Sequence, residues 1–364
     1  MYKLHFSVSS FSLLALDMIF DPRFYGGVNY RVINNNGTAY SYLTKKGIKE
    51  TYDLSKNLLN KEFSSELIKK SEVLNGKMKK YKTPKLTGVN VFKRWYELVE
   101  LFDDFDDLYR FYEQPFQQAL EEKIIKKCKN KNQIVELLKK PSLAKKINFD
   151  EEESYALNLL IKMGRFKLEL HESAVPFVDS INIFGKFLAK KYNLSLNQAL
   201  HLRKEEFEKA LNGKNPNINL INERLKGYAL IPKNKKWHCF SGKDYLYWKK
   251  KIEKNQPEYI RGDVSYPGRV KGRAVIHLDW IGGVDIPKGS VLVCGMTNPQ
   301  IVPFLKNASA IVADEGGLTC HAAIISRELK IPCIVGTGNG TRLIKKGDLI
   351  EVDANKGEVK IIKK

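Results

Sequence analysis

The sequence has few cysteines, and their placement excludes a disulfide or zinc framework. Its 364 residues include five cysteines, at positions 128, 239, 294, 320 and 333. The number is odd, the cysteines are widely scattered, and no pair has the spacing of zinc ligands or of a secreted disulfide scaffold. We therefore expect a chain that folds in the reducing cytoplasm and is long enough for two cores without covalent staples.

Long apolar runs are also missing. No stretch reaches the eighteen or more apolar residues that a membrane-spanning helix needs. The apolar patch from Phe11 to Leu16 is interrupted by serine and followed by Asp17, and no small-residue cleavage site is visible. We expect a soluble protein without membrane contact, whose N-terminus belongs to a folded domain.

Nucleotide-binding loops are a third absence. Between Met1 and Pro257 the sequence contains neither a GxxxxGK[ST] loop nor a GxGxxG turn. No βα-repeat barrel follows the last strands, and no metal-ligand cluster is evident. The chain is therefore expected to hold no metal and no nucleotide cofactor of its own.

Positive charge is what the sequence has in excess. The formal net charge is +21, and the residues from Pro257 onward hold 15 of the 62 basic and 11 of the 41 acidic side chains, so the excess lies upstream. Such a surface can attract nucleic acid, an anionic membrane or phosphorylated molecules, or it can simply be a set of solvated lysine-rich helices. Because the charge is spread over many helices without a recognisable nucleic-acid motif, we do not expect nucleic acid as the partner.

The region from residue 50 to 225 has the periodicity of a helical bundle. Apolar residues recur at spacings of three and four, as in Leu98, Leu101, Phe102, Phe105 and Leu108. Long helices are predicted over 151–170 and 187–211, the second interrupted near 193–195, where Ser195 can cap a new start. Hairpins are predicted over 25–42, turning at 34–37, and over 227–240.

The period changes after Pro257 to alternating strands and helices. Strands are predicted over 264–270, 274–278, 290–294, 310–313 and 333–335, helices at 321–329 and near 343, and a closing hairpin over 349–362. We therefore expect a multidomain α and α/β protein. Its parts are a mainly helical domain over 1–225, a hairpin and linker over 226–261, and a β/β/α domain over 262–364.

One motif in this second part has the arrangement of a phosphate site. Gly316 and Gly317 follow a strand and precede a helix that starts at His321. Two glycines allow a tight turn and close approach of a ligand, and the helix start presents unpaired N–H groups and the positive end of its dipole. A histidine with an ordinary pKa of about 6.5 is mostly neutral in the cell, so a ring nitrogen can attack phosphorus.

Neighbouring residues can support this histidine. Ala322 and Ala323 are small and would leave the ring accessible. Thr319 can bind a phosphate oxygen or cap the helix, and Cys320 can pack or take part in redox chemistry. Arg327 lies six residues on, and a phosphate contact and a structural ion pair are both open.

The run from Gly316 to Leu329, GGLTCHAAIISREL, followed by Ile331-Pro332, resembles the phosphohistidine signature of the phosphoenolpyruvate (PEP)-utilising enzymes. These include phosphoenolpyruvate synthase (pyruvate, water dikinase) and pyruvate, phosphate dikinase. The resemblance covers about residues 262 to 362 and implies a swivelling domain whose His321 carries a phosphoryl group. It also implies phosphate support from Gly316, Gly317, Thr319, Cys320, Ala322 and Arg327, and it places Thr319 where a regulatory kinase phosphorylates some phosphoenolpyruvate synthases. Lys330 stands where the family usually has glycine, and a positive φ there would cost about 1 kcal/mol.

The resemblance implies a phosphotransferase that is incomplete alone. An ATP-grasp protein would supply the nucleotide site with Mg²⁺ in trans, and an unknown small molecule would be the acceptor. The order of a helical domain before the histidine domain also resembles rifampin phosphotransferase, so residues 1–257 are a candidate acceptor- or partner-binding domain. A cluster on one predicted helix, Arg165, Lys167, Glu169 and His171, is either an acceptor site or a polar helix face. The alternatives are a phosphohistidine relay without turnover, and a basic binding protein for nucleic acid or another anionic partner with an inert histidine domain.

Overall fold

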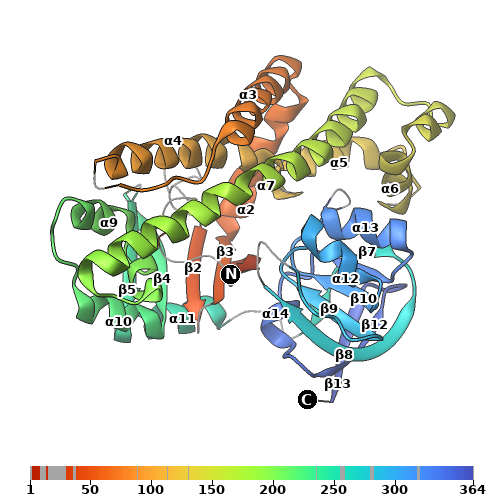
Figure 1. The fold of residues 1–364 in the computed structure, drawn as a ribbon. Coiled ribbons are helices and arrows are strands. Elements are labelled where there is room, and N and C mark those ends of the chain that lie inside the picture. The colour runs from red at the N-terminus through yellow and green to blue at the C-terminus, as the bar shows by residue number, and fades with distance from the viewer. Residues whose placement is uncertain are drawn as a thin grey trace.

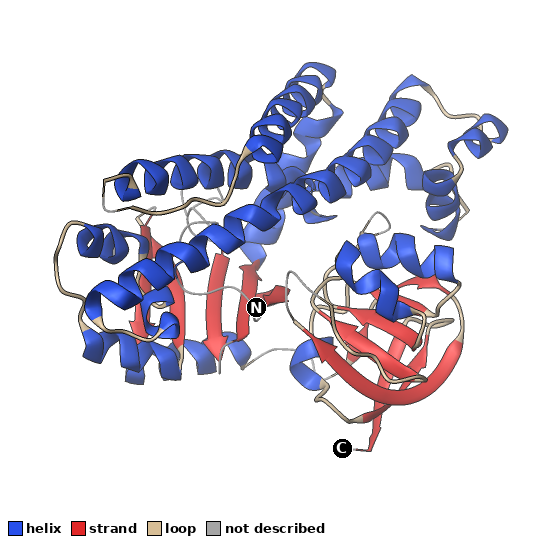
Figure 2. Ribbon diagram, viewed as in Figure 1, coloured by secondary structure: helices blue, strands red, loops and turns tan. Residues whose placement is uncertain are grey.

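The computed structural model describes residues 2–8, 14, 30–35, 38–87, 89–112, 114–129, 131–234, 236–254, 259–278, 283–317 and 320–363. Helices predominate in the first two thirds of the chain, where they pack on a small sheet (Figure 1). A mixed α/β domain follows (Figure 2). This is the predicted fold class, a helical part before an α/β part.

The N-terminal sheet joins strands from both ends of the helical region. The strands are β1 (Tyr2–Val8), β2 (Tyr30–Asn35), β3 (Thr38–Thr44), β4 (Tyr228–Lys233) and β5 (Lys236–Ser241). Their order is β1-β3-β2-β4-β5, and every pairing is antiparallel. Both predicted hairpins are present in the described residues, and the turn at 36–37 lies outside them. The three-part division of the chain stays a prediction, but the second hairpin shares its sheet with β2.

Side chains alternate between the two faces of this sheet, as the pleat requires. Val32, Leu230 and Trp237 face the helices and join their core. Ile33 and Ile231 face the other way and pack against α11. The sheet is therefore buried between two layers.

The helices of this part lie between β3 and β4 in the chain, apart from α11, which follows β5. The bounds are α2 (Lys45–Ser55), η1 (Lys56–Leu59), α3 (Lys61–Lys80), α4 (Val91–Tyr109), η2 (Arg110–Tyr112), α5 (Gln114–Ile125), α6 (Lys131–Lys139), η3 (Pro141–Lys146), α7 (Glu151–Tyr192), α8 (Leu196–Leu200), α9 (Lys204–Leu211), α10 (Ile218–Lys226) and α11 (Gly242–Glu253). Trp95 of α4 is fully buried, with its ring stacked on Phe207 at 4.5 Å and edge-on to Phe184 at 5.2 Å. These contacts join α4, α7 and α9 into one core.

Helix α7 corrects the prediction of two separate helices. It runs unbroken for 42 residues, through Pro176, and ends at Tyr192 before Asn193 in the left-handed conformation, with φ 50°. Phe177 and Phe184 are fully buried along it, so packing outweighs the missing proline N–H. The predicted restart is confirmed, because Ser195 caps α8 with a hydrogen bond from the Gln198 N–H.

The C-terminal domain is built on one curved sheet. Its strands are β6 (Ile260–Arg261), β7 (Asp263–Tyr266), β8 (Arg269–His277), β9 (Ser290–Cys294), β10 (Ala308–Ala313), β11 (Cys333–Val335), β12 (Leu349–Asp353) and β13 (Glu358–Lys363). The order is β6-β13-β12-β8-β9-β10-β11-β7, and the central strands β8 to β11 are parallel. The helices are η4 (Pro299–Ile301), α12 (Val302–Leu305), α13 (His321–Leu329) and α14 (Gly340–Leu343). The predicted elements from residue 290 onward are confirmed with small shifts at their ends, whereas β6, η4 and α12 were not predicted. The division of the first two strands around Gly272 was wrong: β8 runs unbroken through Gly272, and the break lies at 267–268, where Gly268 has φ 147°.

The two parts touch along the side of the C-terminal domain that carries α13. Met296, in the loop after β9, packs against the core of the helical part. Helix α6 contacts β7, and α13 faces α5 and α6 (Figure 1). Strand β3 and helix α14 are also close to each other. Burial and the charge of Glu253 raise the pKa of Tyr42 on β3, and the nearby charge of Arg342 on α14 opposes this rise. The loops after β9 and β10 therefore lie on the side that faces the helices.

Within the described residues, no helix combines the length and the hydropathy that crossing a membrane requires.

Candidate functional site

The glycine loop and its histidine lie at the carboxyl ends of two neighbouring parallel strands. In the register of β9 and β10, Val293 lies opposite Val312 and Cys294 opposite Ala313. The loops that leave these two strands therefore start side by side. Ligands of open parallel sheets bind at this edge.

The first glycine of the pair is required by packing. A Cβ on Gly316 would lie 2.5 Å from Cβ of Val335 and 2.7 Å from the N atom of Gly336, so no larger residue fits beside β11. Gly317 is buried, and its carbonyl accepts a hydrogen bond of 3.1 Å from the Cys320 N–H. This turn carries the chain from β10 to α13. Leu318 and Thr319 lie outside the described residues, so the phosphate-binding role of Thr319 stays a prediction.

Cys320, and not Thr319, is the N-cap of α13. Its backbone is extended, and Sγ accepts a hydrogen bond of 3.4 Å from the Ala323 N–H. A thiol is a weak acceptor, but it satisfies one of the free N–H groups at the helix start. The capping role considered for Thr319 is therefore wrong. His321 is the first residue of the helix.

His321 is held through one of its two ring nitrogens. Nδ1 lies 2.8 Å from Oγ1 of Thr297, which is 2% exposed in the loop after β9. The imidazole is half-buried, and burial lowers its pKa to about 4. It is therefore neutral at pH 7. When Nδ1–H donates to Oγ1, Nε2 carries the lone pair and is the nucleophilic nitrogen.

The start of α13 adds backbone donors beside this ring. Ala323 N–H is used by the Cys320 cap and Ile324 N–H by the Cys320 carbonyl. In the described part of the chain no group accepts from the N–H of His321 or Ala322. Such donors at a helix N-terminus bind phosphate oxygens.

The alanines after the histidine serve packing. Ala322 and Ala323 are 2% and 0% exposed and belong to the apolar core under α13. Their methyl groups therefore face the sheet, and larger side chains would push the helix away from it. Ala322 contributes to the site through its backbone.

Arg327 lies six residues along the helix from the histidine, about 1.7 turns or 9 Å by helix rise. Its Nη1 donates to Oγ of Ser265 on β7 at 3.1 Å, and its side chain is buried, which lowers its pKa. This contact fixes α13 on β7. A phosphate contact for Arg327 stays a prediction.

Two residues around the site were given no role there by the sequence. Thr297 is one: the stretch 297–299, which follows a buried parallel strand, agrees with the resemblance to the PEP-utilising enzymes, but no contact with His321 was predicted for it. Asp314 is the other: its buried carboxylate accepts from Oγ1 of Thr337 at 2.6 Å, from Gly340 N–H at 2.5 Å, and from both N–H and Oγ1 of Thr341. Burial raises the pKa of Asp314, and these donors oppose the rise. Asp314 ties the end of β10 to α14 and so fixes the base of the glycine loop.

One member of the polar cluster on α7, Glu169, is part of a helix contact. Glu169 accepts a hydrogen bond of 3.0 Å from Nδ2 of Asn75 and pairs with Lys79 at 3.7 Å, and Ser173 donates to Oδ1 of the same asparagine at 2.7 Å. Arg165 is exposed, and the side chain of His171 is not among those described. The structure therefore places Glu169 in the contact between α3 and α7.

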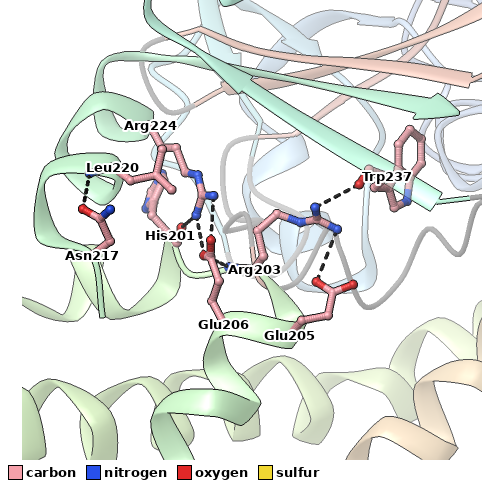
Figure 3. A network of polar contacts seen from close by, with 8 residues as sticks. All are labelled: His201, Arg203, Glu205, Glu206, Asn217, Leu220, Arg224 and Trp237. Atoms are coloured by element: carbon pink, nitrogen blue, oxygen red, sulfur yellow. Dashed lines mark hydrogen bonds and ion pairs between the residues drawn. The ribbon is translucent and has the colours of Figure 1, made fainter. Parts of the chain in front are cut away.

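A second polar network joins α8, α9 and α10 to β5 (Figure 3). Arg224 makes two hydrogen bonds to Glu206, of 2.6 and 2.9 Å, and one of 3.2 Å to the His201 carbonyl. Arg203 donates to the Trp237 carbonyl at 2.9 Å. These charges are matched internally, so the network supports the fold.

A groove of about 710 Å³ lies between α3 and α4. Its floor is apolar, and its rim carries both signs of charge, with Lys70 paired to Glu66 and Lys77 to Asp104. Among the described residues no three His, Cys, Asp or Glu side chains are grouped as metal ligands.

Comparisons with known proteins agree with the C-terminal geometry. Residues 286–357 match the family model described as PEP-utilising enzyme, mobile domain. A probable phosphoenolpyruvate synthase from Methanothermobacter thermautotrophicus is 36% identical over 150 residues, which are 38% of this chain and 22% of that protein. The phosphoenolpyruvate synthase of Aeropyrum pernix is 48% identical over 101 residues, 28% of this chain and 12% of that protein.

The chain thus matches less than a quarter of the length of either relative. Among solved structures, an NMR structure of Enzyme I (nEIt) aligns with 68% of this chain and 80% of its own at 18% identity. Its TM-score of 0.21 is too low to define a shared fold.

Proposed function

We propose, from the premise that residues 286–357 form a mobile domain of the PEP-utilising enzymes, that this chain is a phosphotransferase component with His321 as its phosphoryl carrier. The observation that carries the proposal is the pairing of Nδ1 with Thr297 at 2.8 Å. It holds a neutral ring in one orientation, and with Nδ1–H as the donor to Thr297 it leaves Nε2 as the nucleophile. The relatives named phosphoenolpyruvate synthase support the same class of chemistry.

The transfer requires one bond to form and one to break in each half reaction. The Nε2 lone pair attacks the phosphorus of a donor in line, and the P–O bond breaks with its electrons on the leaving oxygen. The N–H groups of His321 and Ala322 hold the phosphoryl oxygens during this step. In the second half a deprotonated acceptor oxygen attacks phosphorus and the N–P bond breaks with its electrons on Nε2, which restores neutral His321.

The donor half requires a second protein in this proposal. The described residues offer no cluster of metal ligands, and residues 1–257 have neither of the two glycine-rich nucleotide loops. An ATP-grasp protein acting in trans would supply the nucleotide and its Mg²⁺. A regulatory phosphorylation of Thr319 belongs to the same proposal.

The helical part is proposed to present the acceptor. Met296 and α6 bring the two parts together on the side where His321 lies, and the ring is half-buried there. The carrier loop therefore faces the helices when the two parts are docked. A movement of the C-terminal domain is needed to expose His321 to a donor protein.

The test is phosphorylation in the presence of candidate donors. The full chain is incubated with phosphoenolpyruvate, or with ATP, Mg²⁺ and an ATP-grasp protein, and its intact mass is measured. The expected result is one added phosphoryl group that is lost in acid and stable in alkali. It should be absent from His321→Gln and present in His238→Gln, in which an exposed histidine is changed. Label on both variants would refute the assignment, and no label from any donor would favour the basic binding-protein alternative.

A further inference from the structure

The surface formed by β5 and α11 concentrates positive charge and aromatic rings. Residues 233–254 contain eight lysines and two acidic residues, together with five Trp, Tyr or Phe side chains. On the sequence alone the charge is spread over many helices. The fold gathers this part of it on one face, because β5 and α11 are packed together at the edge of the sheet.

The aromatic rings form a continuous row across this face. On β5, His238 and Phe240 are two residues apart and stack at 6.5 Å with an interplanar angle of 24°. Phe240 is 6.0 Å from Trp248 of α11, which in turn is 5.5 Å from Tyr247. Tyr247 is 59% exposed, and His238 is also exposed. Water therefore reaches both ends of the row.

Lysines lie along the same row. Lys251 Nζ is 4.8 Å from the ring centre of Trp248 and 5.4 Å from that of Tyr247. Lys243, Tyr247 and Lys250 are spaced by four and three residues and so share one side of α11. Lys243 and Lys250 are exposed and have no ion pair with any described residue. Their charge is available to an anion.

The aromatic row is also fixed by packing on the opposite sides of β5 and α11. The other side of β5 is fixed by Trp237, which is 5% exposed in the helical core, and by the hydrogen bond from Arg203 to its carbonyl (Figure 3). On the α11 side, Tyr245 and Ile252 are buried against the sheet. The surface is thus rigid before any partner binds.

We infer that this surface binds single-stranded nucleic acid. Aromatic rings that are spaced along a surface stack on bases of any sequence, and lysines beside them follow the phosphates. A small anion would use the lysines but not a row of four rings. An anionic membrane would need several protruding apolar side chains, and beyond the row itself the described part of β5 and α11 offers one large one, Leu246, which is 59% exposed. The inference is independent of the phosphoryl carrier.

The test is anisotropy of a labelled 15-nucleotide RNA or DNA strand titrated with the full chain. Wild type should bind, with little sequence preference, and three lysine–phosphate contacts predict that affinity falls about 20-fold between 50 and 200 mM salt. Tyr247→Ala should weaken binding about tenfold through lost stacking. The triple reversal Lys243→Glu, Lys250→Glu, Lys251→Glu should abolish binding.

Matched controls separate this surface from general charge. A triple reversal of the exposed lysines Lys49→Glu, Lys69→Glu and Lys186→Glu changes the net charge equally and should keep most of the affinity. Equal losses in both triple variants would overturn the inference. So would absence of binding by wild type, tighter binding to the duplex of the same sequence, or binding only to phosphatidylserine vesicles.

Discussion

Thr297 provides the sharpest single-residue test of the carrier site. Thr297→Val keeps the shape of a 2% exposed side chain and removes the oxygen that lies 2.8 Å from Nδ1 of His321. A hydrogen bond of this kind contributes about 0.5–1.5 kcal/mol. If it orients the ring for transfer, the phosphorylation rate should fall about two- to tenfold. Loss of the same hydrogen bond should also lower the melting temperature, by about 1–5 °C and no more, because the side-chain volume is nearly kept and no cavity forms.

The assay is single-turnover phosphorylation of His321, followed by intact mass, for wild type, Thr297→Val and Thr297→Ser. Serine retains the hydroxyl and should restore most of the rate. Nitrogen chemical shifts of the imidazole should show Nδ1–H in wild type and a mixture of tautomers in Thr297→Val, a change that loss of packing alone would not produce. An unchanged rate and tautomer in Thr297→Val would refute the positioning role.

Three further predictions concern pH, the buried carboxylate and the helix end. Because burial lowers the pKa of His321 to about 4, the phosphorylation rate should be flat from pH 8 to about 5 and fall below it. Because the unfolded chain binds this proton at a higher pH than the folded chain does, the free energy of unfolding should decrease as pH falls from about 6.5 to 4. This decrease should be smaller in His321→Gln. A phosphorylation rate that falls already at pH 6.5 would contradict the lowered pKa. Asp314→Ala leaves four donor groups without their buried acceptor and should lower the free energy of unfolding, measured in urea, by about 3 kcal/mol. Asp285→Ala, at an exposed residue, should lower it by almost nothing, and equal effects of the two variants would contradict the structural role of Asp314. Lys330 has φ 57°, so Lys330→Gly should raise the free energy of unfolding by about 1 kcal/mol. Lys306→Gly, at a helix end with right-handed backbone, should not raise it. A lower free energy of unfolding in Lys330→Gly would disprove the backbone strain at this residue.

Local patterns in the sequence predicted the C-terminal domain well. The strand, glycine pair and helix start at His321 are encoded by neighbouring residues, and the structure confirms helix 321–329 and strand 333–335. The positive φ expected at Lys330 is also present. These features depend on backbone chemistry within a few residues.

Features that depend on tertiary contacts were not predictable in the same way. Separate helices were predicted over 151–170 and 187–211, but burial of Phe177 and Phe184 keeps α7 continuous through Pro176. The partner of His321 is 24 residues earlier, in a loop that only the pairing of β9 with β10 brings close. The row of rings on β5 and α11 also arises from packing between two elements.

The most direct test of the central claim is the position of the phosphoryl group on the imidazole. The chain is labelled with nitrogen-15 in histidine, phosphorylated by its donor, and analysed by NMR at alkaline pH, where phosphohistidine is stable. With Nδ1 held by Thr297, we expect a single phosphohistidine, at His321, with phosphorus on Nε2. Phosphorus on Nδ1, or on another residue, would contradict it.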